Sequence, residues 1–269
     1  MDPNEPDNIT EIKKEDNEET PERPDADEGE LNGEVLTHDD EGRVITRSNF
    51  KHGKLDGETI TYDENGRIIE KSHFENGELH GESVSYDENG WMSQKENFKN
   101  GKLHGEMMSY EEGNLRTKIM YKEGLQDGEA IHYGGNGEVI GIANYERGKL
   151  HGETIWYDTE GRLVAKFQYE DGKLNGERTE YHASGQIRER SHYKSDRLEG
   201  ELVRYYESGK IREKLYYKDG KQYGKTIEYD EDGSVKEEGK KKKSVFWQWL
   251  IGRIRSKKIP STTVGGIKG

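Results

Sequence analysis

A short motif, Leu-x-Gly-Glu, returns along this chain at an almost constant interval and constrains the fold more than any other feature. Its glycine is found at Gly33, Gly57, Gly81, Gly105, Gly128, Gly152, Gly176 and Gly200, with an altered ninth copy at Gly224. The spacing is 24 residues at every step except Gly105 to Gly128, where it is 23. A fixed period of this length predicts one small supersecondary unit per copy, stacked on its neighbours.

Each unit has the pattern of two β-strands. In the second unit Ile60 and Tyr62 follow the anchor glycine at alternate positions, which is typical of a strand. An Asn-Gly or Asp-Gly turn follows, and such turns supply the positive φ of tight hairpins. The second strand runs from Ile68 to Phe74, and its even spacing predicts that both residues face the same side. A further Gly turn leads to the next unit.

The pattern therefore predicts an all-β fold: an elongated, antiparallel, single-sheet meander of about nine 24-residue β-hairpin repeats over residues 29–239. Hydrophobic residues make up only 28% of the chain, far below the roughly 45–50% of a usual globular domain. A thick central core is thereby excluded. One buried stripe of about two aromatic and two aliphatic side chains per unit accounts for how so polar a chain folds.

With Gly-x-Leu-x-Gly-Glu, a following Tyr, an Asn-Gly turn and an aromatic before the next Gly, the units resemble the MORN-repeat variant. They look most like the bacterial YwqK-type proteins, which are labelled toxin–antitoxin antitoxins. The resemblance covers about residues 29–239 and implies a repeat fold that serves as an interaction surface. Proteins of the wider family are linked to scaffolding and membrane attachment. The chain departs from the pattern at Gln126, Asp196, Gln222 and Lys225.

The two ends have opposite charge. Residues 1–28 hold twelve acidic and three basic residues without an aromatic, which predicts a disordered acidic tail. Residues 240–269 hold nine basic residues and no acid, around an apolar run that predicts a short amphipathic helix. Two interpretations stay open: this helix caps the exposed final strand, or it docks on an anionic membrane or a partner. The residues that would dock are Lys241, Lys242, Lys243, Phe246, Trp247, Trp249 and Leu250.

No catalytic, cofactor-binding or metal-binding residue is predicted, and we expect no enzyme activity. The chain has no Cys, so thiolate chemistry is excluded, and every candidate catalytic group recurs by repetition. His80, His104 and His151 share one repeat position, which is explained by a polar turn residue more simply than by a metal ladder. The Glu after each anchor Gly is expected to pair with Lys54, Lys102, Lys149 or Lys173 on adjacent strands.

We therefore expect a non-enzymatic scaffold for protein–protein interaction, of which antitoxin-like binding of a basic partner is one form. The formal net charge of −14 favours a basic protein and argues against nucleic acid. Tyr62, Tyr86, Tyr157 and Tyr181 are the candidate partner surface. The alternative is a peripheral membrane adaptor held on anionic lipid by the C-terminal tail. An acidic start without an apolar region, and no apolar run of about 20 residues, predict a cytoplasmic protein, peripheral to the membrane in the alternative.

Overall fold

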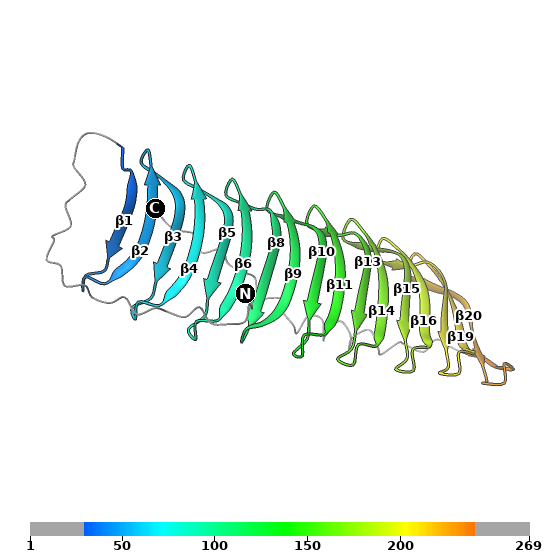
Figure 1. The fold of residues 1–269 in the computed structure, drawn as a ribbon. Helices are drawn as coiled ribbons and strands as arrows, with labels where there is room; N and C mark the ends of the chain where they lie inside the picture. Colours follow the sequence, from blue (N-terminus) through cyan, green and yellow to red (C-terminus); the bar gives the residue numbers. More distant parts are fainter. Residues whose placement is uncertain (1–29, 240–269) are drawn as a thin grey trace.

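The computed structural model describes residues 30–239, which form one antiparallel sheet of 21 strands without a helix (Figure 1). Every strand pairs with its neighbours in sequence, so the sheet is an open meander. The strands are β1 (Gly33–His38), β2 (Val44–Lys51), β3 (Lys54–Tyr62), β4 (Ile68–Glu75), β5 (Glu78–Tyr86), β6 (Met92–Lys99), β7 (Lys102–Leu103), β8 (Gly105–Glu111), β9 (Asn114–Lys122), β10 (Leu125–Tyr133), β11 (Val139–Glu146), β12 (Lys149–Leu150), β13 (Gly152–Tyr157), β14 (Leu163–Glu170), β15 (Lys173–Tyr181), β16 (Ile187–Lys194), β17 (Arg197–Leu198), β18 (Gly200–Tyr205), β19 (Ile211–Lys218), β20 (Lys221–Tyr229) and β21 (Val235–Gly239).

The predicted fold class is confirmed. Three first strands are each interrupted by one residue, giving the short β7, β12 and β17, so the described residues make nine hairpins in the expected order. The predicted disordered acidic tail (1–28) and basic C-terminal helix (240–269) lie outside the described residues. Figure 1 shows the result as a long twisted ribbon, with turns between units along one side and turns within units along the other.

Two kinds of turn alternate along the sheet. Within a unit, Asp63 Oδ1 accepts hydrogen bonds from the backbone N–H of Asn65 (2.8 Å) and Arg67 (2.9 Å), and Gly66 has a φ of 76°. Hydrogen bonds from Arg67 hold the pKa of the Asp63 carboxyl below its usual range. Between units both central residues have positive φ, as at Asn76 (52°) and Gly77 (89°). The second kind matches the right-handed strand twist and keeps consecutive units in one sheet.

The anchor glycine creates a bulge between units. Ser48 pairs with Thr59 and Phe50 pairs with Leu55, so three residues of β3 oppose the single Asn49 of β2. Gly57, with a φ of 111°, is one of the three, and the Asn49 side-chain amide donates to the Glu58 carbonyl at 2.9 Å. Only glycine adopts this φ without strain, which explains why the motif keeps it in every unit.

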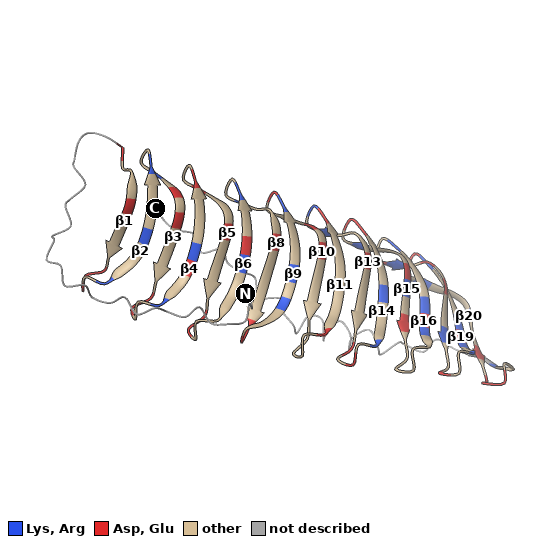
Figure 2. Cartoon of the chain, in the orientation of Figure 1, with Lys and Arg blue, Asp and Glu red and all other residues tan. Residues whose placement is uncertain are grey.

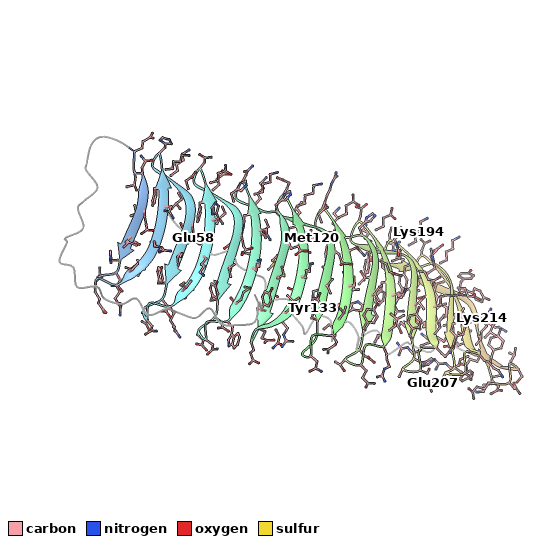
Figure 3. All side chains as sticks on the ribbon, in the orientation of Figure 1. Glu58, Met120, Tyr133, Lys194, Glu207 and Lys214 are labelled. Carbon is pink, nitrogen blue, oxygen red and sulfur yellow. The ribbon has the colours of Figure 1, made fainter. Side chains whose placement is uncertain are left out.

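The sheet has two chemically different faces. The leucine face carries the motif leucines, each paired with an aromatic of the preceding unit, as in Phe74 with Leu79. The same aromatic opposes the anchor glycine of its own hairpin, Gly57, which leaves room for the ring. The tyrosine face carries the Glu after the anchor glycine and the tyrosines of the Tyr62 position. Figure 3 shows side chains leaving the sheet on both sides, with no second layer over the described strands.

The prediction that Ile68 and Phe74 face the same side, made from their even spacing, is wrong. A second bulge between Thr61 and Tyr62 leaves one extra residue in β4, and Ile68 pairs with Tyr62 while Phe74 pairs with Gly57. Paired residues share a face of the sheet, whereas the consecutive residues Thr61 and Tyr62 point to opposite faces. Ile68 therefore belongs to the tyrosine face and Phe74 to the leucine face. Each face then receives one aromatic row.

The largest apolar cluster lies on the leucine face in the C-terminal half. Ala165, Phe167, Leu174 and Tyr193 are buried there, with Trp156, Tyr169 and Leu198 packed against them. In the N-terminal units the central row of this face is polar but equally buried, as at Ser72 and Ser83, whose hydroxyls hydrogen-bond to each other at 2.8 Å, and it becomes apolar again at Met107, Ile119, Ala130 and Ala143. Flanking side chains of neighbouring rows provide the cover that a second layer gives in a sandwich.

Candidate protein-interaction surface

The tyrosine face consists of three parallel rows that run the length of the sheet. The first row is the Glu after each anchor glycine: Glu34, Glu58, Glu82, Glu106, Glu129, Glu153, Glu177 and Glu201. The central row alternates an aliphatic side chain from the first strand of a unit with a base from the second. The third row holds the tyrosines. Figure 2 shows this alternation as basic segments on β2, β4, β9 and β14 beside acidic ones on β1 and β3.

The glutamate row pairs with the central bases of the same hairpin. The carboxylate–ammonium distances are 2.6 Å for Glu82–Lys95 and Glu106–Lys118, 3.5 Å for Glu153–Lys166 and 3.1 Å for Glu201–Lys214. The hydrogen bond that Lys118 donates to Glu106 raises the pKa of Lys118, and the one that Lys214 donates to Glu201 raises the pKa of Lys214.

Pairing with bases was predicted for the glutamate row, but with the wrong lysines. Lys102 pairs with Glu123 (3.8 Å) and Lys149 with Asp171 (4.0 Å), and no ion pair joins Lys54 or Lys173 to the row within the described residues. The predicted lysines precede the bulge, which carries them away from the row. The structure is thus a self-neutralised ladder along one face.

The four predicted tyrosines share one row, in two neighbouring pairs of units. Tyr62, Tyr86, Tyr157 and Tyr181 are half-buried. Each pairs with the aliphatic residue that opens the next strand, as Tyr86 does with Met92. The Lys71 ammonium lies 5.6 Å from the centroid of the Tyr86 ring, a cation–π geometry. One side of each ring packs in the sheet, and the exposed remainder is available for contact.

A buried charge network on the leucine face was missed by the sequence analysis. Glu189 accepts from Arg178 at 2.7 Å and from Arg204 at 2.8 Å, and Arg204 also donates to Glu213 at 2.7 Å. Arg178 also pairs with Glu180, and its side chain is only 5% exposed. The one available signal is that Arg178 replaces the Thr or Ser of Thr59 and Ser83 in the central row. Charge spacing alone does not reveal which face a bulged strand presents.

The three histidines of the shared repeat position each meet a carboxylate. The Nδ1–Oε distances are 3.1 Å for His80–Glu75, 3.4 Å for His104–Glu123 and 3.4 Å for His151–Glu146. Within residues 30–239 no group of three or more His, Asp or Glu side chains has a geometry that could hold a metal ion. In all three units the histidine at this position contacts a carboxylate near the turn between units.

One surface depression of about 460 Å³ lies on the sheet where β17 and β18 are separated. It is lined by Glu177, Arg190, Ser191, His192, Glu199, Gly200, Glu201 and Val203. Its rim is mainly acidic.

Within residues 30–239 there is no helix with the length and hydrophobicity of a membrane span. The candidate tail residues Lys241, Lys242, Lys243, Phe246, Trp247, Trp249 and Leu250 lie outside the described residues.

Five segments of the chain match the family model described as MORN repeat variant: residues 55–76, 79–100, 150–171, 174–195 and 198–219. These five units are similar to MORN-variant repeats. Each match starts at the motif leucine and ends near the turn to the next unit. The MORN-variant matches leave out residues 30–54, 101–149 and 220–239, and the departures Gln126, Gln222 and Lys225 lie in the last two of these stretches.

Comparison with curated proteins and solved structures adds little to the MORN-variant match. No curated protein matches the chain. A GtfA/B complex bound to UDP and GlcNAc aligns at 18% identity over 40% of this chain and 22% of that chain, with a TM-score of 0.18. A TcdB2-TccC3-Cdc42 structure aligns at 12% identity over 73% and 13%, with a TM-score of 0.21. The chain spans under a quarter of each, and scores this low carry no functional argument.

Proposed function

We propose that this chain is a non-enzymatic scaffold that binds a basic protein partner along its extended sheet. The observation that carries the proposal is the charge of the repeats. The acidic and basic tails offset each other, so residues 29–239 hold the full net charge of −14. A long anionic surface with half-buried tyrosines offers electrostatic steering together with aromatic contacts. MORN-type repeats occur generally in proteins that bind other proteins or membranes, which supports the same conclusion.

The partner is expected to be a cytoplasmic protein with a basic surface. In the antitoxin-like form of the proposal it is a basic toxin, neutralised when the sheet covers its active surface. No step of chemistry is assigned to the scaffold. Tyr62, Tyr86, Tyr157 and Tyr181 provide the aromatic contacts, and the net negative charge of residues 29–239 as a whole provides the steering.

A pull-down with the full chain tests this function. We expect a basic protein in stoichiometric amount, with an affinity that falls as salt rises, because steering between exposed charges is screened. Tyr86→Ala and Tyr157→Ala should weaken capture, while Ile69→Lys, at an exposed position outside the tyrosine row, should not. Capture of a partner that is independent of salt and of both tyrosines would contradict the proposal.

The alternative function is a peripheral membrane adaptor, favoured by the tail of nine bases around Phe246, Trp247, Trp249 and Leu250. Basic flanks with Trp suit anionic headgroups. Co-sedimentation with phosphatidylserine vesicles, using the full chain and a chain lacking residues 240–269, separates the two functions. The adaptor requires binding that the deletion abolishes, whereas the scaffold requires none.

A further inference from the structure

The central row of the tyrosine face departs from its alternation in three units: Thr179 replaces the aliphatic residue in the seventh, Glu238 replaces the base in the ninth, and an aliphatic residue replaces the base in the fifth. Elsewhere the base of the second strand separates the aliphatic residues of consecutive first strands, as Lys71 separates Ile60 from Val84. In the fifth unit the base is replaced by Ile142, which pairs with Ile131 on one side and Ile155 on the other. Three isoleucines therefore lie side by side on three neighbouring strands, and we name them the isoleucine patch.

The break changes how well the row is covered. Ile60, Val84 and Val203 lie between two long basic side chains and are only 4%, 7% and 3% exposed, whereas Met108, between Lys95 and Lys118, is half-buried. Lys and Arg stems cover neighbouring apolar surface while their charges stay in water. The isoleucine patch lacks that cover at its centre, and all three side chains are only half-buried. Nothing else within residues 30–239 lies over them, because the sheet has a single layer.

The same unit changes the charge beside the patch. Glu106 and Glu153 in the flanking units pair with Lys118 and Lys166. Glu129 holds the equivalent position, but Ile142 stands where its lysine would be, and Glu129 makes no ion pair within the described part of the chain. The charge of Glu129 contributes to raising the pKa of Lys118, which is already paired with Glu106. The surface thus combines an apolar stripe with a carboxylate that lacks an ion pair of its own among the described residues, the complement of a basic apolar segment.

We infer that the isoleucine patch binds the C-terminal tail, residues 240–269, of a second copy of this chain. The tail supplies Phe246, Trp247, Trp249 and Leu250 for the isoleucines, and nine bases for a sheet whose net charge is −14. Burial of large aromatic side chains against aliphatic ones is the contact that contributes most at small interfaces. A basic side chain beside Glu129 restores the pairing that the other units make internally.

The reach of the tail selects a second copy over the same molecule. Eight strand spacings separate β21 from β11, which is about 38 Å along the sheet at roughly 4.8 Å each. A fully extended chain advances at most about 3.5 Å per residue. From Gly239, Trp247 reaches about 28 Å and Trp249 about 35 Å at that limit. Ile155, the residue of the patch nearest to β21, lies seven spacings or about 34 Å away, so Trp247 stops short of the whole patch in its own chain and Trp249 touches only its edge at full extension. The tail of a neighbouring copy is not limited in this way.

The test is the oligomeric state of the full chain, measured by analytical ultracentrifugation over a range of concentrations. Ile142→Lys restores the repeat pattern and should keep the fold, since Lys71, Lys95, Lys118 and Lys166 already occupy this row. We expect the unaltered chain to self-associate, and Ile142→Lys or deletion of residues 240–269 to weaken association at least about tenfold, the loss typical of a central contact. Ile69→Lys, the same change at an exposed isoleucine in β4, away from the patch, is the matched control.

Mixing completes the experiment. The tail-deleted chain keeps the patch and the Ile142→Lys chain keeps the tail, so an equimolar mixture should associate although neither does alone. The inference is overturned if the full chain stays monomeric, if Ile142→Lys associates like the unaltered chain, or if Ile69→Lys causes the same loss. Capture of a basic partner by a monomeric Ile142→Lys chain would leave the scaffold function standing, so the two claims fail separately.

Discussion

At the scale of single residues, the anchor glycine does more than permit a turn. Gly176 has a φ of 120°, and a Cβ at that position would lie 2.9 Å from the Cβ and Cγ of Gln168. Gly185, with a φ of 84°, has open space around it. Both positions strain an L-residue, but only the first adds a clash with the neighbouring unit.

We therefore expect Gly176→Ala to destabilise the fold by about 3 kcal/mol and Gly185→Ala by about 1 kcal/mol. Urea denaturation followed by circular dichroism measures both. Equal losses would mean that φ strain alone explains why each copy of the motif keeps its glycine. A larger loss at Gly185 would contradict the bulge geometry.

The buried phenol of Tyr193 is expected to make the free energy of unfolding depend on pH in the alkaline range. The side chain is 2% exposed, and burial raises the pKa of its phenol to about 12. Because the folded-state pKa lies above the unfolded value of about 10, its contribution is complete below pH 10 and is lost as pH rises toward 12. Tyr193→Phe should reduce the loss of unfolding free energy between pH 9 and pH 11.5. An unchanged pH dependence in the variant would place the titration on other tyrosines.

At the scale of the strand and hairpin, periodicity in the sequence was sufficient for element order but not for side-chain orientation. The 24-residue spacing and the Gly turns locate every hairpin. The two bulges in each unit were not visible, because a bulge adds a residue without changing composition. Ile68 and Phe74 were therefore assigned to one face, and the glutamate row was assigned to Lys54 in place of the same hairpin's base. Tyr62 shares a face with Ile60 as predicted, because the extra residue of the second bulge lies in β4 and leaves the alternation of β3 intact.

The charge network of β15, β16, β18 and β19 tests how far burial strengthens an ion pair. The Glu189 side chain is 13% exposed and joins Arg178 to Arg204, whereas Glu82 is 49% exposed and pairs only with Lys95 among the ion pairs described. Removing one member of a buried network leaves charges uncompensated. Glu189→Gln should cost about 3 kcal/mol of unfolding free energy, and Glu82→Gln less than about 1 kcal/mol. Thermal and urea denaturation of both variants at low and high salt measure the difference, and comparable losses would contradict the role of burial.

At the scale of the whole molecule, the single-layer meander makes stability nearly a sum over units, because each hairpin contacts only its neighbours. Deleting residues 79–102 joins Glu78 to Leu103 and removes one complete unit while keeping the register of the rest. The shortened chain should fold, with an m-value lower by about one ninth, since m follows the surface exposed on unfolding. Deleting residues 79–90 removes half a unit and joins Glu78 to Trp91, so that two second strands become adjacent without an anchor glycine. That chain should lose cooperative unfolding across the junction. If the whole-unit deletion unfolds the protein as completely as the half-unit deletion, the sheet folds as a single cooperative unit, and its stability is not a sum over the repeats.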